Sequence, residues 1–225
     1  MDVDIKQVEF AYGDEDFRLQ IPELKLATGS HTAFVGPSGS GKTTLLRLLA
    51  GITQPQSGAI QIGDHPLHTL SDSNRRAFRI KHIGFVFQDF RLIEYLNVRE
   101  NLRIPYRLNE ALNLTAEVNT RLESLANELQ LAAKLDAAID TLSQGELQRA
   151  AIGRALLPKP ELILADEPTG NLDPSNKSRI LDLLFTQASV NDATLVMVTH
   201  DHALLDRFEQ VVDFEEFHKK EGANV

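Results

Sequence analysis

The chain of 225 residues contains no cysteine. This absence excludes disulfide bonds, thiolate chemistry and cysteine-ligated metal sites. A chain without disulfides suits the cytoplasm. The first ten residues, MDVDIKQVEF, also lack the basic start and apolar stretch of a signal peptide. We therefore expect a cytoplasmic location.

Long hydrophobic runs and an excess of positive charge are also missing. No segment approaches the ~18–20 apolar residues that a membrane-spanning helix needs, so any work at a membrane would require a separate membrane chain. The chain has 23 lysines and arginines against 32 aspartates and glutamates, a net charge of −9. This balance argues against general nucleic-acid binding, which depends on neutralising phosphates, and against attachment to anionic lipid by charge alone.

Glycine is absent between residues 91 and 142. Within this stretch Thr115 is a plausible helix cap. Four apolar residues follow at spacings of four, three and four, the pattern of one helical face: Val118, Leu122, Leu125 and Leu129. The stretch therefore predicts a helical insertion. An earlier helix, expected at 71–80, carries Arg75, Arg76 and Arg79, which we interpret as a solvated face.

Elsewhere, predicted strands alternate with predicted helices. Strands are expected at residues 3–12, 17–26, 32–35, 59–62, 83–87, 161–165, 194–199 and 211–214, and helices at 43–50, 143–157, 174–190 and 202–208. Such alternation indicates an α/β fold with a largely parallel sheet and helices packed against it. Pro22 within the second strand predicts an edge strand or a bend.

Residues 31–51, HTAFVGPSGSGKTTLLRLLAG, read as strand, glycine-rich loop and helix. The loop matches GxxxxGK[ST] from Gly36 to Thr43. Glycines let consecutive backbone N–H groups converge on phosphates, and the helix N-terminus adds a positive dipole end. Lys42 supplies a charge for the β- and γ-phosphates, and the Thr43 hydroxyl can ligate Mg²⁺. An ordinary Gly/Ser-rich turn is the alternative, but strand, helix and GKT in register favour a nucleoside triphosphate site.

The candidate phosphate-binding residues are consecutive: Gly36, Pro37, Ser38, Gly39, Ser40, Gly41, Lys42, Thr43 and Thr44. An apolar run at 162–165 then ends in Asp166 and Glu167. Behind a phosphate loop, Asp166 can hold Mg²⁺ directly or through water. Glu167 can polarise an attacking water. Alone, a strand that ends in two acids is weak evidence, but beside this loop it indicates triphosphate hydrolysis.

Six segments in order resemble the ATP-binding cassette (ABC) ATPases, and the resemblance spans the whole chain. They read GPSGSGKTT at 36–44, Gln88, LSQGELQR at 142–149, LILADEP at 162–168, GNLD at 170–173 and VTH ending at His200. The resemblance implies an ABC-type P-loop NTPase fold with a mainly parallel sheet, N-terminal antiparallel strands and a helical subdomain. It implies one domain, 1–225, with a nucleotide-binding core at 1–88 and 158–225 and a helical insertion carrying the signature at 89–157.

The resemblance also implies roles for single residues, each with a plainer alternative. Tyr12 matches the aromatic ring under adenine, or is a core aromatic. Gln88 matches the glutamine that reaches Mg²⁺ and the attacking water, or simply ends a strand. His200 matches the histidine at the γ-phosphate, or is structural. Asp173 matches the D-loop aspartate at the nucleotide and can also cap the following helix.

The signature departs from its commonest form, with Gln144 where glycine is usual and Glu146 where glutamine is usual, whereas Ser143 and Gly145 are kept. Ser143 and Glu146 have the spacing of a capping box, so one interpretation is that these residues simply start a helix. The functional interpretation uses the same geometry, because a capped helix N-terminus aims N–H groups and a hydroxyl at phosphate. The resemblance implies that Ser143 and Gly145 close on the ATP of a second copy.

The resemblance implies the Mg²⁺-dependent ATPase subunit of a transporter or mechanotransmission complex. Its partners would be a membrane-spanning permease and a second copy in an ATP-sandwich dimer, with no nucleic acid expected. It would sit peripherally on the inner face of the cell membrane. Segments 83–102 and 165–173 resemble the lipoprotein-release, macrolide-export and cell-division subgroup. We expect residues 90–107 to dock the permease, or else to fill the insertion's own core.

Two other classes remain as alternatives. One is a soluble cassette ATPase of DNA repair or translation, but such proteins usually carry coiled-coil insertions or two cassettes. The other is a small-molecule P-loop kinase or a GTPase. That class explains the phosphate loop but neither LSQGELQR nor His200.

Overall fold

A five-stranded parallel sheet crosses the centre of the molecule, with strand order β6-β7-β8-β3-β9. The computed structural model describes residues 1–13, 17–170 and 174–217. The strands of this sheet are β3 (His31–Val35), β6 (Ile83–Val86), β7 (Leu162–Asp166), β8 (Thr194–Val198) and β9 (Gln210–Asp213). All neighbouring strands run parallel, so their carboxyl ends meet at one edge. The largely parallel sheet expected from the sequence is confirmed.

A second sheet is antiparallel, with strand order β2-β1-β4-β5. Its strands are β1 (Val3–Ala11), β2 (Arg18–Leu26), β4 (Ser57–Ile62) and β5 (His65–Pro66). Pro22 lies in β2, which is an edge strand as its proline predicts, because proline has no N–H for a second neighbour. The two-residue strand β5 carries no sequence pattern of its own and was not expected.

The helices form two layers around the parallel sheet. They are α1 (Lys42–Leu49), α2 (Asp72–His82), α3 (Val98–Arg103), α4 (Pro105–Leu108), α5 (Ala116–Glu128), α6 (Gln144–Leu156) and α7 (Pro174–Val190). Short 3₁₀ helices span Leu67–Thr69, Ala132–Lys134, Ile139–Thr141, His202–Arg207 and Phe214–Phe217. The helix expected at 202–208 is therefore a 3₁₀ helix.

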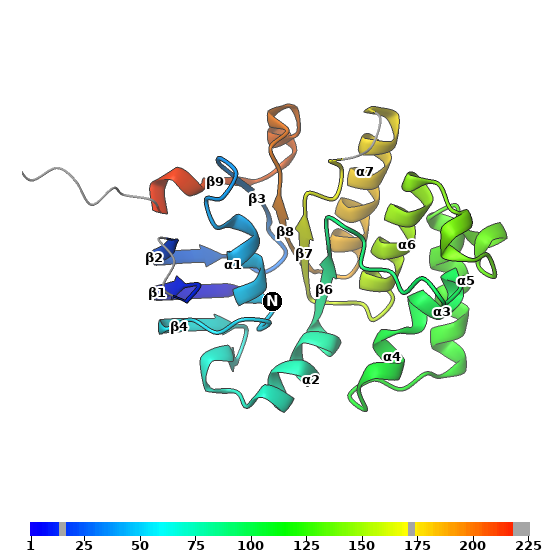
Figure 1. Cartoon of the computed structure of the whole chain (residues 1–225), viewed down its shortest axis with the longest axis horizontal. Coiled ribbons are helices and arrows are strands. Elements are labelled where there is room, and N and C mark those ends of the chain that lie inside the picture. Colours follow the sequence, from blue (N-terminus) through cyan, green and yellow to red (C-terminus); the bar gives the residue numbers. More distant parts are fainter. Residues whose placement is uncertain (14–16, 171–173, 218–225) are drawn as a thin grey trace, which may run out of the picture.

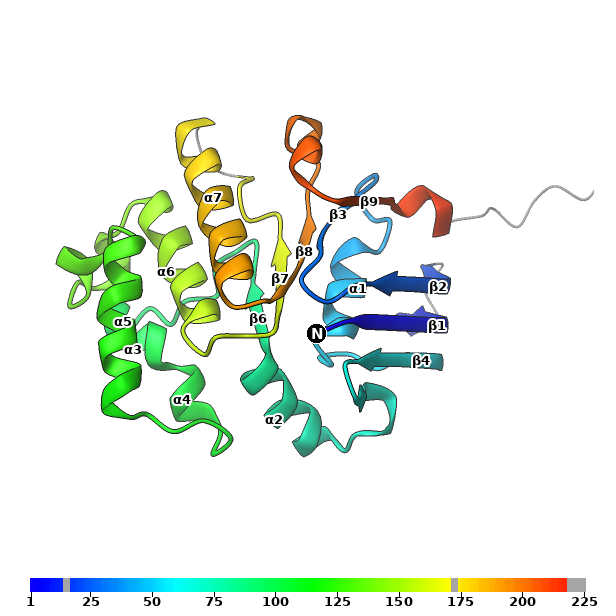
Figure 2. The ribbon, with the colours of Figure 1, turned by 180° about the vertical axis from the view of Figure 1, so that it is seen from behind.

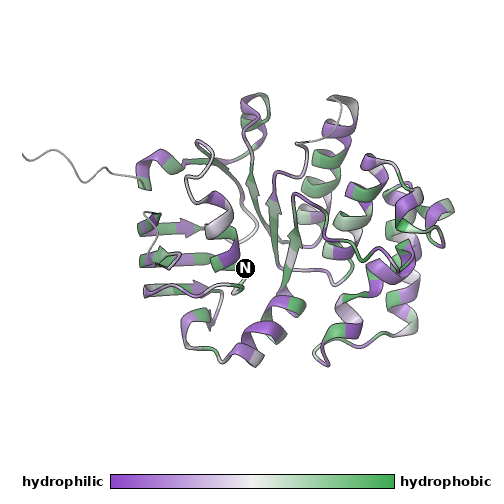
Figure 3. Cartoon of the chain, in the orientation of Figure 1, coloured by the Kyte–Doolittle hydropathy of each residue, from purple (hydrophilic) through white to green (hydrophobic). Residues whose placement is uncertain are grey.

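Two hydrophobic cores lie on opposite faces of the parallel sheet, because side chains alternate along each strand. In β7, Leu162 and Leu164 face the core shared with α1 and the antiparallel sheet. Ile163 and Ala165 face the core shared with α3, α5, α6 and α7. Figures 1 and 2 show α1 between the two sheets and the remaining helices, except α2, beyond the parallel sheet. The central strands are hydrophobic along most of their length (Figure 3).

The helix cap and the apolar face predicted within the insertion are both confirmed. The Thr115 side chain accepts a hydrogen bond from the Val118 N–H and so caps α5. The apolar face predicted for this helix is buried.

The prediction that the arginines of α2 form a solvated face is wrong for two of the three. Only Arg76 is a solvated side chain, whereas Arg75 donates to the Leu70 carbonyl and Arg79 to the carbonyls at the end of α1.

Within the described ranges, no helix combines the length and hydropathy required to cross a bilayer.

Candidate functional site

The loop between β3 and α1 wraps around the N-terminus of the helix. Gly41 precedes α1 with φ of 94°, in the left-handed region. A side chain there would begin 3.0 Å from the Phe17 ring and 3.1 Å from the Leu19 side chain. At Gly36, with φ of 135°, a side chain would begin 3.1 Å from Phe214 Cβ. Both positions therefore need glycine, which leaves the N–H groups of the loop unobstructed.

Lys42 lies under this loop and is only 7% exposed. Its ammonium group donates three hydrogen bonds to the loop's own oxygens: Gly36 O at 2.8 Å, Pro37 O at 2.7 Å and Ser40 Oγ at 3.2 Å. Burial lowers the pKa of Lys42, and the nearby negative charge of Glu167 opposes the shift. The loop thus holds a compact cation at its centre, as a phosphate site requires.

Asp166 and Thr43 form a pair of oxygen donors below the loop. The Thr43 hydroxyl donates to Asp166 Oδ1 at 3.1 Å. The aspartate is 5% exposed, and burial raises its pKa while the Thr43 bond opposes the rise. A buried carboxylate beside a hydroxyl is the hard donor set that Mg²⁺ prefers. No cluster of three or more histidines and acids in the described ranges could hold a metal alone. A cation here would therefore need further ligands beyond Thr43 and Asp166.

Three side chains converge at the carboxyl ends of neighbouring strands β6, β7 and β8. Gln88 Nε2 donates to Glu167 Oε2 at 3.3 Å, and His200 Nδ1 lies 3.2 Å from the same oxygen. Glu167 has a positive φ of 44°, and its N–H donates to the Val198 carbonyl at 3.1 Å. The side chain is thus held where the sheet ends, facing the phosphate loop.

Tyr12 lies on the other side of the loop. Its ring packs edge-on against Phe10 at 4.7 Å between centroids and tilts against Phe17 at 5.9 Å. Its hydroxyl lies 3.4 Å from Thr44 Oγ1. The sequence assigns no role to Phe17, although an aromatic residue directly before β2, the strand that pairs with the strand preceding Tyr12, is a usable signal. Together these rings form an apolar wall suited to a flat base.

These groups line one cleft of about 580 Å³. The predicted site residues that line it are Tyr12, Gly36, Ser38, Gly39, Gly41, Lys42, Thr43, Thr44, Gln88, Glu167 and His200. Pro37, Ser40 and Asp166 do not line it but bond directly to Lys42 or Thr43. The fold therefore assembles residues from five separate stretches of sequence. Asp173 lies outside the described residues.

The signature residues are not part of this cleft. Ser143 caps α6 in a full capping box: Ser143 Oγ accepts from the Glu146 N–H at 3.4 Å, and Glu146 Oε2 accepts from the Ser143 N–H at 2.8 Å. The hydrogen bonds that the Ser143 N–H and the Ser143 hydroxyl donate to the Glu146 carboxylate lower the pKa of Glu146. Gly145 lines a different pocket with Arg149 and Asn176. The helix-cap interpretation is confirmed, and it is compatible with a second role at phosphate.

Comparison with known proteins gives consistent results. A family model described as ABC transporter matches residues 19–170. The uncharacterized ABC transporter ATP-binding protein YbbA of Escherichia coli K12 is 40% identical over 208 residues, 91% of this chain and 90% of the relative. The lipoprotein-releasing system ATP-binding protein LolD 1 of Rhodopirellula baltica is 42% identical over 192 residues, 84% of this chain and 83% of the relative.

Solved structures of ATP-binding cassettes resemble this chain over most of its length. A dimeric post-hydrolysis state of the ATP-binding cassette MJ0796, bound to ADP and Pi, superposes with a TM-score of 0.84 and 30% identity. The match covers 94% of this chain and 93% of the other. A second dimeric structure of MJ0796 covers 99% of both chains with the same TM-score.

Proposed function

The chain belongs to the ABC transporter family, and on that premise we propose the site residues, metal and partner surface through which it works. It is an ATP-binding subunit that hydrolyses ATP to power a separate membrane partner. Neither the DNA-repair or translation cassette nor the kinase or GTPase is favoured, since the named relatives are transporter ATP-binding proteins. Within the chain, we assign residues 1–88 and 158–225 to the nucleotide-binding core and 89–157 to the helical insertion.

The residue assignment rests on one observation: Gln88 and His200 both contact the same oxygen, Glu167 Oε2. Glu167 accepts a proton from the attacking water, and Gln88 and His200 orient its carboxylate at the cleft. Lys42 and the loop N–H groups bind the phosphates, and Tyr12 supports the base. Thr43, Asp166 and Gln88 would hold Mg²⁺, which supplies charge neutralisation at the β- and γ-phosphates when bound.

Glu167→Gln tests this assignment. The amide keeps the size of the carboxylate but is a far poorer proton acceptor, so we expect kcat to fall by about 10²-fold or more with ATP affinity within about twofold. Phosphate release and labelled-ATP titration measure the two quantities. The control is Glu110→Gln, which changes an exposed carboxylate outside the cleft. Normal turnover in Glu167→Gln would remove Glu167 from the mechanism.

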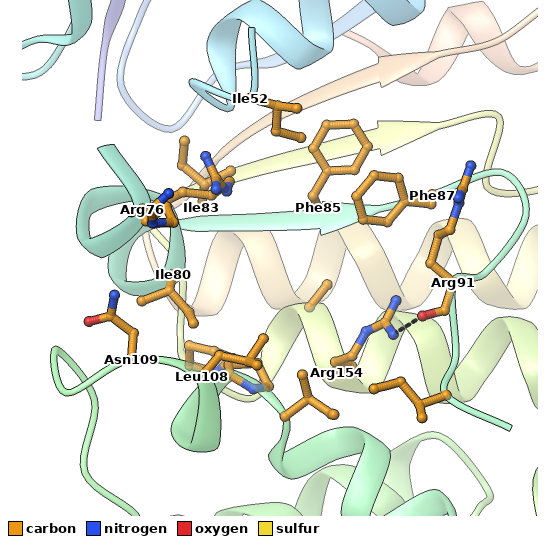
Figure 4. Close-up of a pocket in the computed structure, with 16 residues that line it drawn as sticks. Ile52, Arg76, Ile80, Ile83, Phe85, Phe87, Arg91, Leu108, Asn109 and Arg154 are labelled. Atoms are coloured by element: carbon orange, nitrogen blue, oxygen red, sulfur yellow. Dashed lines mark hydrogen bonds between the residues drawn. The ribbon is translucent and has the colours of Figure 1, made fainter. Parts of the chain in front are cut away.

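For the membrane partner we propose a docking groove of about 420 Å³ beside the insertion (Figure 4). The groove runs between α2, β6, α4 and α6. Its lining is mostly apolar, and two lining residues are unusually exposed, Leu108 at 69% and Ile52 at 44%. Tyr95, in the segment after Gln88, is 86% exposed. Such a patch beside charged arginines fits an amphipathic cytoplasmic helix of the permease.

The side chains of the segment predicted to dock the permease, residues 90–107, do not all face the same way. Leu92 packs against the core of the insertion, whereas Ile93 lines the groove and Tyr95 faces outward. Docking through Ile93 and Tyr95 places the chain peripherally on the inner face of the cell membrane. The homologous LolD proteins are named as parts of a lipoprotein-releasing system. We propose a membrane complex of that general kind for this chain.

Crosslinking tests the groove, and the cysteine-free chain makes it specific. Tyr95→Cys and Leu108→Cys should each form an adduct with the permease that co-purifies from membranes. Val190→Cys is the matched control, because Val190 is 74% exposed but lies on α7, away from the groove. If neither Tyr95→Cys nor Leu108→Cys forms an adduct in an active complex, the permease docks elsewhere.

A further inference from the structure

The segment that follows Gln88 contains two consecutive residues in the left-handed region, Phe90 with φ of 60° and Arg91 with φ of 51°. Neither is glycine, so each carries the steric strain of a Cβ close to its carbonyl oxygen. Such a turn persists only where surrounding contacts fix it. The turn begins two residues after Gln88, where the chain leaves β6 for the insertion.

The contact that fixes this turn comes from α6. The Arg154 guanidinium donates from Nη2 to the Phe90 carbonyl at 2.6 Å. It also donates from Nη1 to the Arg91 carbonyl, as Figure 4 shows. The Arg154 side chain is half-buried at the wall of the groove, and burial lowers its pKa to about 10. Within the described ranges, no carboxylate lies at ion-pair distance. The turn's two carbonyls are therefore the main protein partners of this half-buried positive charge.

The same end of α6 is also held against β6, the strand that leads to Gln88. A side chain at Gly84 would begin 2.7 Å from the Ala155 carbonyl and 2.8 Å from Pro160, so strand and helix approach as closely as a glycine permits. The other end of α6 carries Ser143 as its cap. Helix α6 therefore joins the Gln88 segment to the signature through continuous, hydrogen-bonded backbone.

We propose that Arg154 is a positioning residue that ties the Gln88 segment to α6 and so holds Gln88 in contact with Glu167. The proposal rests on the proposed role of Gln88. Arg154 touches neither nucleotide nor Glu167. Its loss should therefore lower kcat through a misplaced Gln88 and leave ATP binding by the loop around Lys42 intact. A guanidinium that only stabilised the fold would not separate kcat from KM in this way.

Arg154→Met tests the proposal, because methionine keeps the apolar stem and removes every donor. We expect kcat to fall about tenfold or more with KM for ATP within about twofold. Arg154→Lys, which retains a charge and three donors, should recover part of the loss. Arg121→Met is the matched control. Arg121 also donates to a backbone carbonyl at the end of α6, that of Leu157, but among the described residues it forms no hydrogen bond with the Gln88 segment.

A double-mutant cycle tests whether Arg154 acts through Gln88. If Arg154 acts through Gln88, adding Arg154→Met to Gln88→Ala should cause no further fall in kcat. Additive losses, or an equal kcat loss in Arg121→Met, would overturn the proposal. Amide exchange across residues 88–92 should accelerate in Arg154→Met but not in Arg121→Met, and unchanged protection would also overturn it. If exchange accelerates while neither Gln88→Ala nor Arg154→Met lowers kcat, the proposed role of Gln88 fails instead.

Discussion

At the scale of single residues, one carboxylate oxygen organises the cleft. Gln88 and His200 reach Glu167 Oε2 from strands on either side of β7. Asp166, the adjacent residue, turns instead to Thr43. Two consecutive acids therefore serve different purposes, because neighbouring residues at a strand end point to opposite sides.

Lys42→Ala is the prediction that belongs to this scale. The ammonium group is the full positive charge at the centre of the loop, and charge-assisted hydrogen bonds contribute about 1.5–3 kcal/mol. We therefore expect ATP affinity to fall by about tenfold to a hundredfold and hydrolysis to be lost. Titration with labelled ATP measures the first effect and phosphate release the second.

Lys25→Ala serves as the control, since Lys25 is a largely exposed lysine paired with Glu23. Undiminished ATP binding together with normal turnover in Lys42→Ala would contradict the phosphate-binding assignment.

At the scale of elements, the start of α6 combines a structural and a functional task. The capping box between Ser143 and Glu146 satisfies N–H groups that would otherwise lack partners. Glu146, the carboxylate of this capping box, stands where the signature more commonly has glutamine. A negative charge at this helix N-terminus interacts favourably with the dipole, so the departure stabilises α6 without any nucleotide.

This cap gives a pH dependence with a definite sign. Hydrogen bonds from Ser143 lower the pKa of Glu146 below its ordinary value of 4.5. The stabilisation is therefore complete above that value and disappears as the pH falls through the lower folded-state pKa. Glu146→Ala should reduce the free energy of unfolding by about 1 kcal/mol at neutral pH. The difference from the native chain should vanish in acid.

Chemical denaturation at several pH values measures this difference. Glu117→Ala is a useful comparison, because Glu117 lies in the first turn of α5 but the cap of that helix is the Thr115 side chain. A wild-type minus Glu146→Ala difference that stays constant into acid would show that the carboxylate is not the stabilising group.

At the scale of the whole molecule, the phosphate loop and the signature lie in different clefts. Ser143 and Gly145 do not line the cleft that contains Lys42 and Glu167, so one copy does not surround a nucleotide with both. The structural neighbours are dimers, and one of them holds ADP and Pi. Two copies related by two-fold symmetry would bring each signature onto the other copy's nucleotide.

The corresponding prediction concerns oligomeric state. Glu167→Gln should be dimeric with ATP and Mg²⁺ and monomeric without them, since unhydrolysed ATP favours the closed pair. Adding Ser143→Arg should return it to monomer by placing bulk and charge in the interface. Light scattering after size-exclusion chromatography measures the mass.

The control places the same substitution elsewhere. Ser124→Arg changes an exposed serine on α5 and should leave the dimer intact. An ATP-bound dimer that tolerates Ser143→Arg as readily as Ser124→Arg would limit the signature to capping a helix.

Local features of this protein were determined by the sequence itself. The glycines around Lys42, the caps at Thr115 and Ser143, the proline in β2 and the apolar face of α5 all act within a few residues, so their patterns predict them. The acids at the end of β7 were found for the same reason, because a buried strand and its polar end are contiguous.

Contacts between distant segments were decided by the tertiary structure. Gln88 and His200 share one oxygen because β6, β7 and β8 are adjacent in the sheet, which no local period encodes. Arg79 looked like part of a solvated face, yet it caps the carbonyls of Ala50 and Gly51. No sequence pattern predicts that Arg154 holds the segment after Gln88. A long side chain reaches backbone acceptors far away in sequence, and only the packing of helices and sheet determines which carbonyls those are.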